Sequence, residues 1–232
     1  MQLLINKTKH TRGTLYLSAN HIGCAEDIPP RALELQKSCE LVVFEENRQA
    51  RKVLKQAGVT RQWLRYNEHH QESSLAQIEE TLMAGKNVIY MSDQGCPTLA
   101  DPGKNLLRLA YKLKSRVRII PGPSSITAAI SACPFELEQF IYKGFLSQKS
   151  AQRDQEIAKI SKEKMPIIIL DTPYRLSSLL LSLKSQKIQK RIFIAFDITG
   201  EDEQYYIGSV SELYKLHSEK NKKNFVLIIE GK

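Results

Sequence analysis

Residues 88–103 read VIYMSDQGCPTLADPG, and this stretch decides the fold that we expect for the chain. The apolar run 88–91 is typical of a buried strand, and a helical pattern over 105–113 follows the loop behind it. In open α/β sheets, ligands bind outside the carboxyl ends of the strands. We therefore expect a ligand at this loop, and the alternative is an ordinary crossover loop between a strand and a helix.

Four residues of the loop predict that it is rigid and comes close to its ligand. Gly95 and Gly103 let the backbone approach a bound molecule, because they carry no side chain. Pro97 and Pro102 fix the backbone torsion φ and remove two N–H donors. Together these residues indicate a stiff cradle at the end of the strand.

Strand and helix patterns alternate along the whole chain. Such alternation predicts an α/β fold, here with two α/β/α domains and mainly parallel sheets. The turn Pro121-Gly122-Pro123 divides two roughly equal sets of elements, so we expect domains at 1–119 and 120–232. The expected strands are 14–19, 41–44, 63–66, 88–91, 117–120, 140–142, 167–170, 191–196 and 225–229, with 205–208 as an antiparallel hairpin strand; the expected helices begin near 31, 48, 73, 105, 126, 151 and 176.

The charge of the chain favours a polyanionic partner. The sequence has 232 residues with a net charge of +9, although a basic balance also occurs in proteins that bind no nucleic acid. Residues 48–55 carry four basic side chains at helical spacing, and residues 104–118 carry six basic side chains and no acidic one. These two stripes are candidates for phosphate contacts.

Cysteines and apolar runs exclude several other classes of protein. The four cysteines form no C-x-x-C pair, so we expect reduced thiols and no metal. The adjacent pair His69-His70 is expected to be solvated, because neighbouring loop residues rarely converge on one ion. No apolar run approaches the ~20 residues that span a bilayer, and residues 1–12 lack the apolar stretch of a signal peptide. We expect a cytoplasmic protein.

A second proline-containing turn also indicates a ligand site. Residues 121–125 read PGPSS and interrupt the strand 117–120, and Ser124 is placed to cap the helix that follows. The free N–H groups at the start of that helix suit an anion. We expect the two proline-containing turns, at the ends of neighbouring strands, to hold one ligand between them.

These motifs resemble a known family. Residues 92–97 with 101–103 resemble the SDAGTP…SDPG loop of the tetrapyrrole methylase superfamily of S-adenosylmethionine-dependent methyltransferases, and residues 121–125 resemble its PGPSA turn. Within the superfamily, the chain is most similar to the ribosomal small-subunit methyltransferase I type (RsmI-like). The supporting stretches are 15–27 for LYLVATPIGNLED, 45–52 for EDTRHTRK, 144–146 for GFLP, 171–175 for ESPHR and 197–199 for ELT.

The chain also departs from that pattern. Asn20-His21 stands in place of Thr-Pro, Cys24-Ala25 in place of Asn-Leu, Glu46-Asn47 in place of Asp-Thr, and Gln94 in place of Ala. The sequence ends at Lys232 and resembles the short members of the branch, without the C-terminal extension. Most of these differences fall on the side of the methyl acceptor.

The resemblance implies a function and leaves two alternatives open. It implies a homodimer that uses S-adenosylmethionine, bound in a cleft between the two domains, to methylate a ribose 2′-hydroxyl of 16S rRNA in the small ribosomal subunit. One alternative is a methyltransferase for a tetrapyrrole or another small molecule, since carboxylated tetrapyrroles are also anionic. Another is a non-catalytic RNA-binding protein that retains a donor site, against which the intact glycine-proline turns argue.

The same resemblance implies which residues bind S-adenosylmethionine. Backbone N–H groups at 124–126 suit the carboxylate of the donor's methionine part. Asp93 is expected to shape its loop or to orient the ammonium group of the donor. The implied donor-binding residues are Asp93, Gln94, Gly95, Pro97, Ser124, Ser125, Asp171, Ala195 and Phe225.

An alcohol acceptor must lose its proton as the new bond forms, and a carboxylate or a histidine at the carboxyl end of a strand commonly accepts it. We expect Glu45 in this role, with Glu46, Asp101 and His21 as further candidates. The alternative for Glu45 is a buried ion pair with Arg48 or Arg51. The expected substrate-binding residues are Arg48, Arg51 and Asp101.

Overall fold

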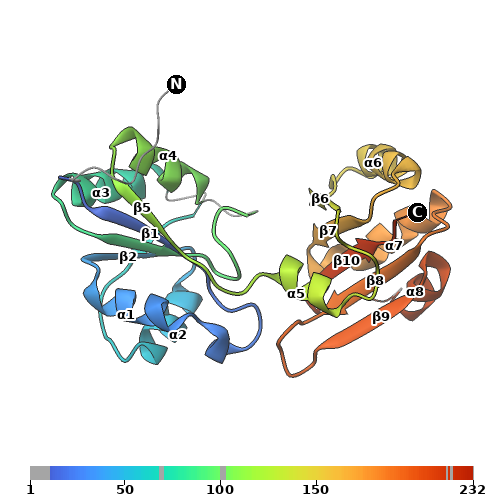
Figure 1. The fold of residues 1–232 in the computed structure, drawn as a ribbon, viewed down its shortest axis with the longest axis horizontal. Helices are drawn as coiled ribbons and strands as arrows, with labels where there is room; N and C mark the ends of the chain where they lie inside the picture. Colours follow the sequence, from blue (N-terminus) through green and yellow to red (C-terminus); the bar gives the residue numbers. More distant parts are fainter. Residues whose placement is uncertain (1–10, 68–70, 100–102, 218, 220–221, 232) are drawn as a thin grey trace. The chain divides into compact units, whose positions relative to one another are not determined.

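A computed structural model describes residues 11–67, 71–99, 103–217, 219 and 222–231 of the chain. The chain divides into two compact units, Met1–Ser124 and Ser125–Lys232, so the division lies five residues after the boundary placed by sequence. We call them unit 1 and unit 2 and treat each by itself (Figure 1). Within the described residues, no helix has the length and apolar character needed to cross a membrane.

Unit 1 is built on a five-stranded sheet in which every pairing is parallel. The strand order is β3-β2-β4-β1-β5, so β1 lies between β4 and β5. We expected the two proline-containing turns to follow neighbouring strands, and this was wrong. They follow β4 and β5, which lie on either side of β1. The strands are β1 Thr14–Ser18, β2 Leu41–Phe44, β3 Leu64–Arg65, β4 Val88–Met91 and β5 Arg116–Ile120.

Helices cover both faces of this sheet. Tyr90 points into a core that contains residues of α3 and α4, whereas its neighbours Ile89 and Met91 point into a second core that contains residues of α1 and α2. A strand buried on both faces explains why 88–91 is continuously apolar. The helices are α1 Pro30–Ser38, α2 Asn47–Gln56, α3 Gln71–Met83 and α4 Lys104–Lys112, with a short 3₁₀ turn η1 at Ala25–Asp27.

Unit 2 confirms the α/β class, but its sheet differs from the mainly parallel one that we expected. The order is β6-β7-β10-β8-β9, and only β6 and β7 pair in parallel. Residues 197–203 between β8 and β9 are too few for a crossover helix, so these strands form a hairpin, as expected for 205–208. The strands are β6 Ile141–Gly144, β7 Ile167–Asp171, β8 Arg191–Phe196, β9 Gln204–Ser209 and β10 Phe225–Ile229.

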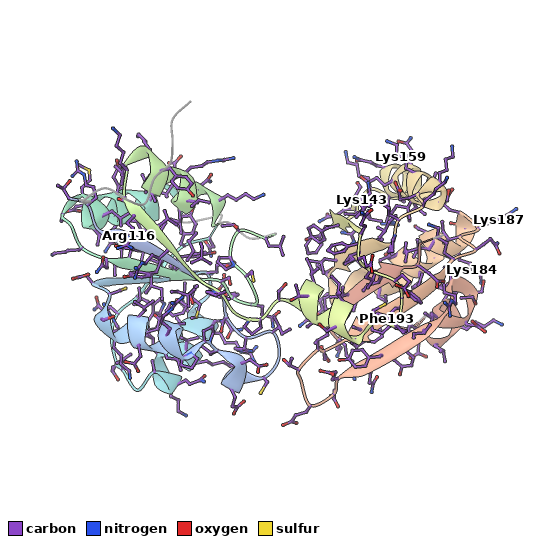
Figure 2. The ribbon with its side chains drawn as sticks, in the orientation of Figure 1. Arg116, Lys143, Lys159, Lys184, Lys187 and Phe193 are labelled. Carbon is purple, nitrogen blue, oxygen red and sulfur yellow. The ribbon has the colours of Figure 1, made fainter. Side chains whose placement is uncertain are left out.

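One face of this sheet packs on α6, α7 and α8 in a single apolar core, and α5 contacts β10. Phe193 of β8, labelled in Figure 2, is buried and stacks on Tyr205 of β9, with 5.7 Å between the ring centroids. The sequence patterns above do not predict α8, although Ser209 and Glu212 form a capping box at its start. The helices are α5 Ser125–Ala132, α6 Ser150–Lys162, α7 Leu176–Ser185 and α8 Val210–Leu216, with a 3₁₀ turn η2 at Pro173–Arg175.

Candidate active site

The loop after β4 is a closed turn. The Ser92 hydroxyl donates to the Gly95 carbonyl (2.7 Å), and the Gly95 N–H donates to the His21 carbonyl (3.3 Å). Gly95 has φ +66°, a left-handed conformation that favours glycine. An added Cβ at Gly95 would meet no atom closer than 3.5 Å, so the backbone conformation, and not lack of space, requires glycine here. The expected cradle therefore has a defined shape.

Asn20 fixes this turn from the end of β1. Its side chain is fully buried, and Nδ2 donates to the carbonyls of Ser92 (3.1 Å) and Asp93 (3.0 Å). Its Oδ1 accepts from the His21 N–H (2.9 Å), and its own N–H donates to the Gly95 carbonyl (2.9 Å). In the sequence, Asn20 stands out only as a departure from the family pattern. The sequence shows only an amide directly after an apolar strand, and the backbone carbonyls that it binds are marked by no residue type.

Three carboxylates lie at the carboxyl ends of β2 and β4. Glu45 Oε1 accepts from the Tyr90 hydroxyl (2.8 Å) and from the Asp93 N–H (3.2 Å). Asp93 Oδ1 accepts from the Glu46 N–H (3.2 Å), and Glu46 forms an ion pair with Arg65 (2.7 Å). The structure thus brings Glu45 and Asp93 together, and the carboxylate of Glu45 contributes to holding the loop.

The second turn meets the first within unit 1. The Cys96 thiol donates to the Pro123 carbonyl at 3.5 Å. An added Cβ at Gly122 would lie 2.7 Å from Pro29 Cγ and 2.9 Å from Ala19 Cβ, so glycine lets this turn pack closely on unit 1. Helix α5 begins at Ser125, directly after Ser124. The two turns are therefore in contact, although β1 separates their strands.

The basic stripe on α2 is present as expected. Arg48, Arg51, Lys52 and Lys55 are exposed, whereas Ala50, Val53 and Leu54 are buried on the opposite side of the helix. Gln94 is exposed in the loop after β4, and Pro97 is partly buried there. Asp101 lies outside the described residues, as do His69 and His70.

His21 is a nearby titratable group. It is mostly buried, and burial, with a further contribution from the charge of Lys52, lowers the pKa of its imidazole. Its Nδ1 atom is buried without a hydrogen-bond partner in the described part of the chain. A lowered pKa keeps this histidine neutral near pH 7.

In unit 2 the expected donor-binding residues form one group at an edge of the sheet. Asp171 at the end of β7 lies opposite Phe225 at the start of β10, and Phe225 also lies opposite Phe196 on β8. Ala195 is next to Phe196 and pairs with Val226. The strand register therefore places these three residues near one end of the sheet, with Asp171 and Phe225 on one face and Ala195 on the other.

Asp171 is the charged member of this group. Its side chain is fully buried; Oδ1 accepts from the Thr172 N–H (2.7 Å) and lies 3.3 Å from Arg175 Nη1. Oδ2 has no hydrogen-bond partner among the described residues. Burial raises the pKa of this carboxyl, and Thr172, Arg175 and Arg153 act in the opposite direction. An unpartnered buried oxygen fits a ligand that carries hydroxyl or amino donors.

Metal ligands do not gather in the described part of the chain, where no group of three or more His, Cys, Asp or Glu side chains could hold an ion. All four cysteines are free thiols. Cys39 is buried, which raises its pKa to about 12, and the other three are partly buried.

Comparison with known proteins agrees with the motifs. A sequence model of the family "Tetrapyrrole (Corrin/Porphyrin) Methylases" matches residues 22–214. Ribosomal RNA small subunit methyltransferase I of Thermotoga maritima is 31% identical over 95% of this chain and 99% of its own length. The protein of the same name from a Synechocystis strain is 30% identical over 94% of this chain and 79% of its own length.

Solved structures show the same fold. The cobalt precorrin-4 methyltransferase CbiF superposes with a TM-score of 0.71 at 16% identity, covering 94% of each chain. Uroporphyrin-III-C-methyltransferase of Thermus thermophilus superposes with a TM-score of 0.66 at 17% identity, also covering 94% of each chain. The family match spans both units and includes both proline-containing turns. The chain therefore belongs to the tetrapyrrole (corrin/porphyrin) methylase family of S-adenosylmethionine-dependent methyltransferases, in the branch of ribosomal RNA small subunit methyltransferase I.

Proposed function

We propose that the protein transfers the methyl group of S-adenosylmethionine to a ribose 2′-hydroxyl of 16S rRNA. The observation that carries this proposal is the anchored turn after β4, which Asn20 holds by hydrogen bonds to Ser92 and Asp93. The relatives named as ribosomal RNA methyltransferases and the net charge of +9 favour RNA as the acceptor. A ribosomal substrate also favours the cytoplasmic location expected from the sequence, and the homodimer stays a prediction.

The residues at both turns fit the donor. In the proposal, Asp93, Gln94, Gly95 and Pro97 line one side of S-adenosylmethionine, and Ser124 and Ser125 present backbone N–H groups to its carboxylate. Asp171, Ala195 and Phe225 contribute to the adenosine side, where the unpartnered Asp171 Oδ2 suits a hydroxyl or amino donor. That these residues act together in a cleft between the units stays a prediction.

The bound donor supplies an already activated methyl group, so the protein mainly has to align it with the acceptor. Correct alignment can contribute up to roughly 7–11 kcal/mol to lowering the barrier. An anchored turn suits this task, because it does not have to be ordered when the donor binds. In the transfer, the acceptor oxygen forms a bond to the methyl carbon, and the carbon–sulfur bond breaks with its electron pair going to sulfur.

The proton of the acceptor hydroxyl goes to a general base, which we propose to be Glu45. Its Oε1 already accepts two hydrogen bonds, which fix the orientation of the carboxylate. Arg48 and Arg51, both exposed, are proposed to contact RNA phosphates, and Asp101 to contact the substrate.

One labelling experiment tests the acceptor. The protein is incubated with methyl-labelled S-adenosylmethionine and either 30S subunits from a strain that lacks this methylation or a carboxylated tetrapyrrole. We expect label in the 16S rRNA, at one internucleotide bond that resists alkaline hydrolysis because its 2′-oxygen is methylated. Label on a base, label only on the tetrapyrrole, or no label on any acceptor would refute the proposal.

A further inference from the structure

Two aromatic side chains of unit 2 are exposed on loops that follow neighbouring strands. Tyr174, in the turn η2 after β7, is 73% exposed, and Phe145, directly after β6, is 48% exposed. Within the described residues, neither ring packs on another aromatic ring, and the Tyr174 hydroxyl makes no hydrogen bond. Aromatic stacking inside unit 2, or a hydrogen bond from the Tyr174 hydroxyl, therefore does not explain why these positions are aromatic.

The backbone that carries the two rings is fixed. Arg175 Nη2 donates to the carbonyls of Leu146 (2.8 Å) and Ser147 (2.9 Å), and its Nη1 lies 3.3 Å from Asp171. The guanidinium thus joins the loop after β6 to the turn after β7. Since β6 and β7 pair in parallel, both loops lie at the carboxyl ends of their strands. This is the edge where α/β sheets commonly bind ligands.

The rings also lie close in sequence to a proposed donor-binding residue. Tyr174 follows Asp171 by three residues, and Asp171 pairs with Phe225 across the sheet. The unpartnered Oδ2 of Asp171 belongs to the same end of β7. A molecule held on the two rings would therefore be near the adenosine side of the proposed donor site.

The local charge favours an anion beside the rings. Lys149 is exposed on the loop that carries Phe145, and the first turn of α6, which follows it, contains no acidic residue. Of the carboxylates in these segments, Asp171 is fully buried beside Arg175, Glu156 accepts the Ser147 N–H (2.9 Å), and Asp154 on α6 is half-buried. An aromatic surface with a neighbouring cation matches a nucleotide, whose base stacks on the ring and whose phosphate contacts the cation.

We propose that Tyr174 and Phe145 form a stacking platform for an unpaired base of the RNA substrate, with Lys149 at the adjacent phosphate. The inference rests on the proposed function and deepens it, because it names the single-stranded part of the substrate that unit 2 binds. Stacking reads no base edge, so the platform holds the target region of the RNA without selecting its sequence.

The test compares Tyr174→Ala, Phe145→Ala and the double variant with Leu216→Ala, a matched control that removes another exposed apolar side chain of unit 2, 65% exposed on α8. We expect KM for 30S subunits to rise roughly 5- to 100-fold in each platform variant, while the affinity for S-adenosylhomocysteine and the melting temperature stay unchanged. Leu216→Ala should leave all three measurements unchanged, and Tyr174→Phe should behave like the wild type, because its ring still stacks.

A second measurement does not depend on catalysis. Trp63 is the sole tryptophan of the chain, so the variant Trp63→Phe/Tyr174→Trp carries one indole on the proposed platform. A short unpaired oligoribonucleotide should quench its fluorescence, whereas a fully paired duplex should quench it much less. Equal quenching by both would overturn the platform.

The remaining outcomes separate the two proposals. If the wild type methylates rRNA and the double variant does so with unchanged KM, the platform is refuted and the proposed function stands. If the wild type methylates no RNA, the proposed function fails and the platform with it. Lost donor binding in Tyr174→Ala would assign the ring to the donor site, and a change from dimer to monomer would assign it to a contact between copies of the chain; either result refutes the platform.

Discussion

Replacement of Asn20 by alanine should loosen the donor loop more than any other single change of one polar side chain at this site. The change removes three side-chain hydrogen bonds, two donated to the carbonyls of Ser92 and Asp93 and one accepted from the His21 N–H. A hydrogen bond contributes about 0.5–1.5 kcal/mol net to stability. Three of them give an expected loss of roughly 1.5–4.5 kcal/mol in the free energy of unfolding of unit 1.

Urea unfolding followed by tryptophan fluorescence measures this loss, because Trp63 is the sole tryptophan and lies in unit 1. Calorimetry with S-adenosylhomocysteine measures the second effect, a fall in donor affinity of at least about tenfold, since a loosened loop must be ordered again on binding. Asn105→Ala is the matched control: its side chain accepts one hydrogen bond, from Arg108, and its loss should change stability by no more than about 0.5 kcal/mol. Equal behaviour of the Asn20 and Asn105 variants would refute the role of Asn20 as an anchor.

Three further predictions concern other residues of the candidate site. Gly95→Ala and Gly58→Ala each place a side chain at a left-handed φ (+66° and +70°), so each should lower the free energy of unfolding by about 1–2 kcal/mol. In calorimetry, only Gly95→Ala should weaken the binding of S-adenosylhomocysteine. Glu45→Gln keeps an oxygen acceptor for its two donors, so donor binding should persist while kcat falls at least ~100-fold; a fall of less than about threefold would show that Glu45 holds the loop and takes no proton. Burial raises the pKa of Asp171, so the native state binds more protons than the unfolded chain, and the stabilisation present at low pH is lost as pH rises through the raised pKa. In calorimetric scans without ligand, the melting temperature of Asp171→Asn minus that of the wild type should therefore be larger at pH 7 than at pH 4, and the opposite trend would contradict this assignment.

Local patterns were sufficient to locate most elements of the fold. The runs 41–44, 88–91, 191–196 and 225–229 are strands with the bounds that we expected, because apolar and β-branched residues end abruptly at polar or turn residues. Strand order and direction in unit 2 could not be read in the same way. A strand pattern predicts an extended segment, but it does not say which strand pairs with it, and β10 pairs with two strands that precede it by at least 29 residues.

The candidate site, like the fold, could be predicted only in part from the sequence. Gly95 and the prolines were found from sequence, because a turn requires particular residue types at fixed positions. Asn20 was missed, since its hydrogen bonds reach backbone carbonyls 72 and 73 residues away, and every residue has a carbonyl. The grouping of Asp171 with Phe225 depends on strand register and was implied only by the family resemblance.

The position of β10 has a consequence for folding during synthesis. It lies between β7 and β8, yet it follows every other strand of its sheet along the chain. The sheet of unit 2 therefore stays split until the ribosome has passed residue 229. At about 5–20 residues per second, unit 1 has roughly 5–20 s to fold before the sheet of unit 2 can be completed. A nascent chain arrested before β10 should accordingly contain a protease-resistant unit 1, followed by a segment that proteases cleave. In that segment the apolar edges of β7 and β8 have no partner strand, so chaperones can bind them.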